Sequence, residues 1–242
     1  MVKLLIVTAI FLGTHLAPVN SSSRTSAYWE FYCAGGNFTP SSTYSRSLDK
    51  IAAELPKKVA SSPLLFAGSQ IGDVHALAQC RQDFTASACK MCIAGGLRDA
   101  VKELLQYPTG NELDITASKR DFLPIILETE PFNTSVRELA RAVARMAATS
   151  PAHFGTGEKK VVQAQYRLTI YALGQCMPNL SDKDCEICLT DLVYAIDIGV
   201  DMTTGRVAKV WCSYRFSLYK FFRGKEVQCI GKEVQCTGKA VE

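Results

Sequence analysis

The sequence has 242 residues, of which 27 are Lys or Arg, 23 are Asp or Glu, 48% are hydrophobic and ten are cysteine. This length suits one large domain or two of about 100 residues, and the balanced charge excludes a disordered chain and a polybasic nucleic-acid binder. The cysteines are too many for an average cytosolic protein and too dilute for a knottin-type scaffold, so their arrangement decides what kind of protein this is.

The N-terminal segment, residues 1–23, has the pattern of a secretory signal. A lysine near the start precedes an apolar run from Leu4 to Leu12, and small and polar residues follow, with cleavage expected between Ala17 and Ser23. The apolar run is shorter than the ~20 residues that span a bilayer, so we expect no membrane span in the mature chain. The mature protein is therefore predicted to be soluble and extracellular, where cysteines form disulfides.

In the first half of the chain the spacing of apolar residues predicts two helices. The first follows Ser41 and Ser42, which can cap it, and is expected to stop at Pro56. The second is expected to start close to Cys89. Their apolar residues recur at helical spacing: Tyr44, Leu48, Ile51, Ala52 and Leu55 in the first helix, and Ile93, Leu97, Val101 and Leu104 in the second.

The second half repeats this plan. One predicted helix carries Val136, Leu139, Val143 and Met146, and another carries Cys188, Leu192, Val193 and Ile196. Residues Tyr166–Gln175 are rich in aromatic and aliphatic side chains, and apolar residues alternate with others from Val210 to Leu218, which predicts two strands. Each half is thus predicted to be two helices on one face of a small antiparallel sheet, an α+β fold.

The cysteine motif C-x8-C-x2-C occurs twice, first as Cys80, Cys89 and Cys92 and then as Cys176, Cys185 and Cys188. Each cysteine of the second copy lies 96 residues after its counterpart in the first. Three coincident offsets predict two homologous domains. We place the boundary near Glu128–Asn133. The expected domains are residues 24–130 and 131–223, followed by a polar tail over 224–242.

The two C-x2-C pairs allow three interpretations. Four thiolates could bind a structural zinc, but the pairs lie 93 residues apart in separate domains. Thiol redox chemistry is a second interpretation, because a helix start lowers a thiol pKa. The extra cysteine nine residues before each pair competes as a bridge partner, however, and no βαβ pattern surrounds the motif. Structural disulfides are the interpretation that the pattern favours.

These motifs resemble a plant family. The repeated C-x8-C-x2-C, with Gly-Arg-Val ahead of a cysteine and an aromatic strand in GRVAKVWCSYRFSLYKFF, is similar to the cysteine-rich repeat secretory proteins. Their repeat is the salt-stress-response/antifungal or ginkbilobin-homologous domain (domain of unknown function twenty-six), which also forms ectodomains of cysteine-rich receptor-like kinases and plasmodesmata-located proteins. The resemblance runs from about Ala27 to Phe222 and implies two helices on a sheet of about five antiparallel strands in each domain.

The resemblance also implies disulfides, namely Cys80–Cys89, Cys176–Cys185 and Cys188–Cys212. Four cysteines depart from the family plan: Cys33, Cys92, Cys229 and Cys236. Cys33 lacks the loop partner and Cys92 the strand partner that the family provides, so we expect the first domain to be the less stable one. The other two lie in a polar tail beyond the family fold, within a duplicated GKEVQC. They are left to bridge each other, to pair with Cys33 or Cys92, or to link to another chain.

No motif of an enzyme is present, because Gly-x-Ser-x-Gly, Walker and His-Glu-x-x-His patterns are all missing. We therefore expect no catalytic residues, metal or cofactor. Some single-domain relatives bind mannose through an Asn after the N-terminal cysteine, an Arg in a Gly-x-Arg-Val turn and a Glu five residues after the strand cysteine. Ala34, Arg206 and Ser217 occupy these positions here, so Arg206 alone matches as a carbohydrate contact.

Three sequons predict N-glycosylation, at Asn37, Asn133 and Asn179. The function expected from these observations and the resemblance is that of a secreted, apoplastic, non-catalytic binding module in plant stress or defence, with a mannose-type glycan as ligand or an antifungal role. One alternative is a partner of cell-surface receptor-like kinases or plasmodesmal proteins without lectin activity. The other is a thiol oxidoreductase that uses Cys89 and Cys92 or Cys185 and Cys188.

Overall fold

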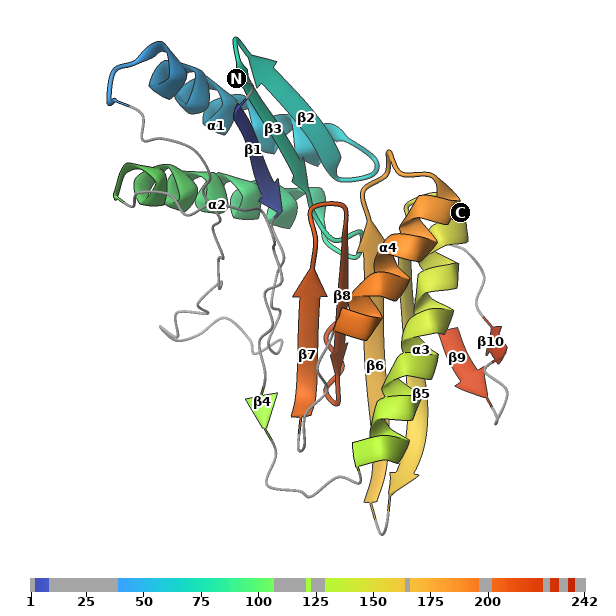
Figure 1. The fold of residues 1–242 in the computed structure, drawn as a ribbon. Coiled ribbons are helices and arrows are strands. Elements are labelled where there is room, and N and C mark those ends of the chain that lie inside the picture. Colours follow the sequence, from blue (N-terminus) through green and yellow to red (C-terminus); the bar gives the residue numbers. More distant parts are fainter. Residues whose placement is uncertain are drawn as a thin grey trace. The chain divides into compact units, whose positions relative to one another are not determined.

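The computed structural model of the chain describes residues 3–8, 39–106, 121–122, 129–163, 166–195, 202–223, 227–230 and 235–237. The chain divides into two compact units, residues 1–115 and 116–242. In the described parts each unit contains two helices and one sheet (Figure 1). This arrangement confirms the predicted α+β class. No helix among the described residues is both long and apolar enough to cross a bilayer.

The first unit is built on helices α1 (Thr43–Ser61) and α2 (Ala86–Gln106) and a three-stranded sheet. Strand β2 (Phe66–Ile71) pairs antiparallel with β3 (Val74–Gln79). Strand β1 (Lys3–Thr8) pairs parallel with the other edge of β3. Because β1 lies within the predicted secretory signal, its cleavage, which stays a prediction, would expose that edge.

Helix α1 begins where the sequence predicts and ends later. The Ser42 hydroxyl accepts a hydrogen bond from the Ser45 amide at 3.1 Å, as an N-cap does. The prediction that the helix stops at Pro56 is wrong, because α1 continues to Ser61. A proline inside a helix costs about 3 kcal/mol. Val59 lies one turn after Leu55 and both side chains are fully buried, so the longer helix buries a further apolar side chain against that cost.

The second unit places helices α3 (Thr129–Thr149) and α4 (Asp182–Ala195) over the same face of its sheet (Figure 1). The central strands run in the order β5-β6-β8-β7, and each pairs antiparallel with its neighbour. Their bounds are β5 Phe154–Gln163, β6 Tyr166–Cys176, β7 Met202–Ala208 and β8 Cys212–Ser217. Strand β6 confirms the strand predicted from Tyr166.

The alternating residues of β8 explain how helices and sheet share a core. Cys212, Tyr214 and Phe216 are buried in one cluster with residues of α3, α4 and β6. The residues between them face the other side of the sheet, where Arg215 stacks 4.1 Å from the centre of the Phe221 ring. The sequence alternation therefore separates the helix-covered face from the opposite face.

Three short strands extend this sheet at its edges. Strand β4 (Asp121–Phe122) pairs with β7, which brings residues after position 115 into the second unit, ahead of the boundary predicted near Glu128–Asn133. Strand β9 (Val227–Ile230) pairs parallel with β5, and β10 (Gln235–Thr237) pairs antiparallel with β9. The tail predicted to lie beyond the fold thus contributes two strands to the described sheet.

Sheet and helix approach each other closely at Gly155 of β5 in the second unit. A Cβ atom there would lie 2.8 Å from both the Ala147 amide nitrogen and the Val143 carbonyl oxygen of α3. Because these are backbone atoms of a helix, we predict that Gly155→Ala lowers the free energy of unfolding by about 1–3 kcal/mol, measured by urea unfolding. In Gly68→Ala on β2 the nearest atom to the new Cβ is the end of the Leu77 side chain at 3.0 Å, and the Ala76 carbonyl oxygen lies at an ordinary contact distance of 3.7 Å. This control should therefore lose less than about 0.5 kcal/mol. Equal losses would contradict the packing argument.

Candidate functional site

The structure contains three disulfides among its described residues, and they are the three that the family resemblance implies. The Cα–Cα distance is 5.8 Å for Cys80–Cys89, 5.7 Å for Cys176–Cys185 and 6.2 Å for Cys188–Cys212. The first two join the end of a strand to the start of the following helix, and the third joins α4 to β8. Each unit is thereby cross-linked between helix and sheet.

This pairing removes the two chemical alternatives for the C-x2-C motifs. Cys89, Cys185 and Cys188 all bond to cysteines outside their own motif, so neither motif forms an internal redox bridge and the four-thiolate zinc set is not available. Cys92 is an unbonded thiol with 5% of its surface exposed. Burial raises the pKa of Cys92 to about 12, whereas a catalytic thiol needs a lowered pKa.

The candidate carbohydrate contact, Arg206, lies half-buried on β7 directly opposite Arg215 of β8. Ser217 shares that face of the sheet, two residues along β8. Its hydroxyl accepts a hydrogen bond from the Tyr219 amide at 3.0 Å, and only 2% of the residue is exposed. Ala34 lies outside the described residues. The structure brings Arg206 and Ser217 onto one face but offers a sugar no exposed acceptor at Ser217.

The other face of the second unit carries an exposed apolar group that the sequence did not single out. Ile187 and Tyr194 on α4 are 49% and 60% exposed, and Trp211 between β7 and β8 is 43% exposed. Ile187 and Tyr194 are seven residues apart, so they lie on one side of the helix. We call the following set the α4 surface: Arg141, Ile187, Asp191, Tyr194, Lys209 and Trp211.

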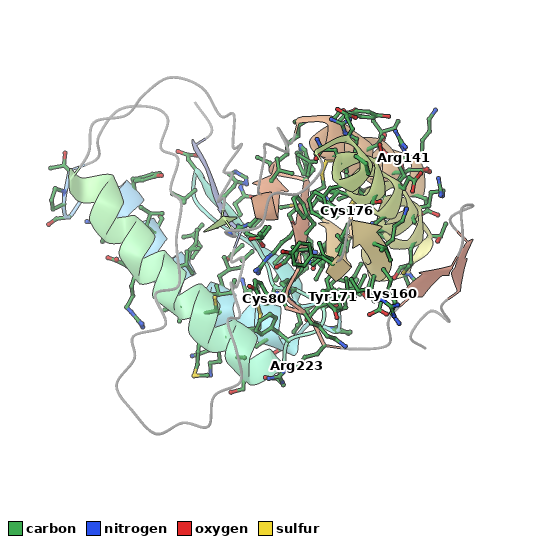
Figure 2. The ribbon with its side chains drawn as sticks, turned by 90° about the horizontal axis from the view of Figure 1, so that it is seen from below. Cys80, Arg141, Lys160, Tyr171, Cys176 and Arg223 are labelled. Atoms are coloured by element: carbon green, nitrogen blue, oxygen red, sulfur yellow. A yellow bond between two sulfur atoms is a disulfide. The ribbon has the colours of Figure 1, made fainter. Side chains whose placement is uncertain are left out.

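Contacts between elements hold the α4 surface together. Arg141 of α3 donates a hydrogen bond to the Tyr194 hydroxyl at 2.9 Å, and its guanidinium lies 5.7 Å from the centre of the Tyr194 ring. Asp191 of α4 pairs with Lys209 at 3.9 Å. Figure 2 shows Arg141 on the helix side of the second unit, away from Tyr171 on the opposite side of the sheet.

The third disulfide limits how far the backbone at Trp211 can lie from α4. Ile187 and Trp211 are the sequence neighbours of the bonded Cys188 and Cys212, whose Cα atoms lie 6.2 Å apart. Consecutive Cα atoms are 3.8 Å apart, so the Cα atoms of Ile187 and Trp211 cannot be more than about 14 Å apart. The exposed stripe on α4 could have been read from the sequence. The contact with Arg141 could not, because Arg141 and Tyr194 are 53 positions apart.

The sequons differ in accessibility. Asn179 is exposed in the turn between β6 and α4. Asn133 lies in the first turns of α3 and is only 7% exposed, so a glycan there would have to displace packed side chains. Asn37 lies outside the described residues. The structure therefore favours glycosylation at Asn179 over Asn133, and occupancy of each sequon stays a prediction.

We predict that the secreted chain carries a glycan on Asn179 and none on Asn133. Enzymatic release of N-glycans in heavy-oxygen water converts each occupied Asn to a labelled Asp, which peptide mass spectrometry detects. Of these two positions, only Asn179 is expected to carry the label, and Asn179→Gln should remove it there. A labelled Asn133 in folded, secreted protein would contradict the burial argument.

We also predict a pH dependence that originates at Cys92. Its folded-state pKa of about 12 lies above the ordinary thiol value of about 8.5, so between these values the unfolded chain releases a proton that the folded chain retains. The stability contributed by the buried neutral thiol is complete below pH 8.5 and is lost as the pH rises towards 12. Between pH 8 and pH 10 the loss should be about 2 kcal/mol in urea unfolding. Cys92→Ala should remove this component, and an unchanged pH dependence in that variant would contradict its assignment.

The comparisons with known proteins agree with this architecture. Residues 32–116 and 125–219 each match the family model described as salt stress response/antifungal. The cysteine-rich receptor-like protein kinase 6 of Oryza sativa subsp. japonica is 33% identical over 224 residues, which cover 80% of this chain and 32% of the kinase. The cysteine-rich repeat secretory protein 38 of Arabidopsis thaliana is 27% identical over 236 residues, which cover 85% of this chain and 90% of that protein.

Solved structures show the same fold. The tandem DUF26 ectodomain of the cysteine-rich receptor-like protein PDLP8 from Arabidopsis thaliana matches with a TM-score of 0.54 at 18% identity, covering 76% of this chain and 95% of that structure. The chain spans about a third of the length of the two rice receptor-like kinases that it matches, numbers 6 and 10. Because both repeats match the family model and together cover most of the sequence, the chain belongs to the salt stress response/antifungal (DUF26) family, in its tandem form.

Proposed function

We propose that the protein works outside the cell as a non-catalytic binding module in plant stress or defence, and that it binds a protein partner through the α4 surface. The stress or defence setting follows the description of the family. The extracellular setting follows the secretory relative and the disulfides. The observation that carries the proposal is the α4 surface itself, where Ile187, Tyr194 and Trp211 stay exposed.

The composition of the α4 surface suits a protein partner. Tyr, Trp and Arg are enriched among the residues that contribute most to protein interfaces, since they bury a large area with few rotatable bonds. Arg141 already stacks on Tyr194, and Asp191 already pairs with Lys209. These side chains therefore lose less conformational entropy on binding than free ones would.

The partner class that we propose is the ectodomain of a cell-surface receptor-like kinase or plasmodesmal protein. Support for this class comes from the two rice receptor-like kinases that the chain matches over about a third of their length. A mannose-type glycan at Arg206 is the less favoured ligand, because the Ser217 hydroxyl is buried and already bonded. Among the described residues, no particular contact favours a general antifungal role without a protein partner.

The test measures binding of the full secreted chain to purified DUF26 ectodomains of receptor-like kinases from the same plant, by biolayer interferometry. Tyr194→Ala and Trp211→Ala are each expected to weaken binding about 30-fold, the effect of removing a central interface aromatic worth about 2 kcal/mol. Tyr219→Ala is the matched control, since Tyr219 is a 55% exposed aromatic that follows the other end of β8, and it should leave binding unchanged.

Two results would overturn the proposal. One is a panel in which no ectodomain binds while a glycan array shows mannose binding that Arg206→Ala removes, which would assign the carbohydrate role instead. The other is equal loss in Tyr194→Ala and Tyr219→Ala, which would place the contact away from the α4 surface. Circular dichroism of each variant confirms that the fold is retained.

A further inference from the structure

The C-terminal tail brings two cysteines to the same point of the sheet. Strands β9 and β10 pair antiparallel, and the register places Cys229 directly opposite Cys236. Strand β9 is itself joined to β5 through Gly157 and Glu158, so the hairpin is an extension of the second unit's sheet. None of the three disulfides in the described residues involves either cysteine.

This register suits a cross-strand bridge. Residues directly opposite in an antiparallel pair share one face of the sheet, and their Cα atoms lie about 4.5 or 5.5 Å apart, depending on whether the pair is hydrogen-bonded. Disulfides accept Cα–Cα distances of about 4.4–6.8 Å. Both values fall in this range, close to the 5.7–6.2 Å of the chain's other bridges.

The duplicated sequence supports the same pairing. GKEVQC occurs at residues 224–229 and again at 231–236, seven positions on. In the observed register Gln228 faces Thr237 and Ile230 faces Gln235, so among the duplicated positions in these strands only the cysteine faces its own copy. A pairing of only three positions is marginal in water without further support, and a covalent link between its strands would supply it.

We propose that Cys229 and Cys236 form a disulfide that closes the β9–β10 hairpin on the edge of the second unit's sheet. The two thiols lose two protons and two electrons and one S–S bond forms. The electron acceptor is a protein disulfide of the thiol-exchange class in the secretory route, which is reduced to a dithiol. Cys33 and Cys92 are then the cysteines outside the four bridges, and Cys92 is the unbonded, buried thiol already described.

The sequence allows a direct test, because trypsin cuts after Lys225, Lys232 and Lys239 and so separates the two cysteines. Full secreted protein that migrates as a monomer on a non-reducing gel is alkylated, digested without reduction and examined by mass spectrometry. The expected product is EVQCIGK linked to EVQCTGK, which separates into the two peptides on reduction. Alkylated free forms of both peptides, or either peptide linked to one that contains Cys33 or Cys92, would overturn the proposal.

Matched variants give a second readout in the unfolded, unreduced monomer. Cys229→Ser should raise the number of alkylated thiols by one, with the new label on Cys236, and Cys236→Ser should do the same at Cys229. The double variant should return to the wild-type number. A new label on Cys33 or Cys92 in either single variant would show that the replaced cysteine was bonded there and would reject the hairpin bridge. Dimers on a non-reducing gel would assign these cysteines to a link between chains.

Discussion

The disulfide between Cys188 and Cys212 joins α4 to β8, and the architecture of the second unit depends on that bond. The two cysteines are 24 positions apart, and closing such a loop in the unfolded chain stabilises the fold by about 3–4 kcal/mol. Domains of this size are stable by only about 5–15 kcal/mol in total. The bond therefore has a large share in keeping β8 against β6, and with β8 the buried Tyr214 and Phe216 that fill the space beneath the helices.

The first unit shows what happens where this bond is missing. Cys92 stands 96 positions before Cys188, is buried like a bridge cysteine and has no bond. In the second unit β6 has β5 on one side and the antiparallel β8 on the other, whereas in the first unit β3 has β2 on one side and the parallel β1 on the other. A strand from the chain's N-terminal segment thus takes the place that a cysteine-bearing strand takes in the other copy. Cleavage of residues 1–23 would remove β1 and leave that edge of β3 unpaired. The first unit would then be the less stable one for two reasons, the absent disulfide at Cys92 and the unpaired strand edge.

The sequence predicted the parts of this fold that local patterns control. Helical spacing located α1 to α4, alternation located β8, and the repeated cysteine figure revealed two similar units. Local patterns failed where contacts between distant residues determine the structure. Helix α1 continues past Pro56 because Leu55 and Val59 pack in the core of the first unit. The tail forms strands because the edge of β5 is available for pairing with β9. The α4 surface was missed for the same reason. Local sequence patterns do not reveal a contact such as that between Arg141 and Tyr194, which are 53 positions apart.

The α4 surface belongs to the second unit alone, and the same bond explains why. At the 96-residue offset of the two cysteine motifs, Ile187, Asp191 and Tyr194 of α4 correspond to Met91, Gly95 and Arg98 of α2. At these positions α2 therefore has one exposed apolar residue but neither the aromatic ring nor the carboxylate. The bond between Cys188 and Cys212 ties the chain next to Trp211 to α4, and α2 has no such bond at Cys92. The first unit therefore has neither the stability that this bridge supplies nor a covalent tie at Cys92 that would fix a strand end near the helix. A partner that recognises the α4 surface should therefore bind the second unit and not the first, even though the two units share a fold.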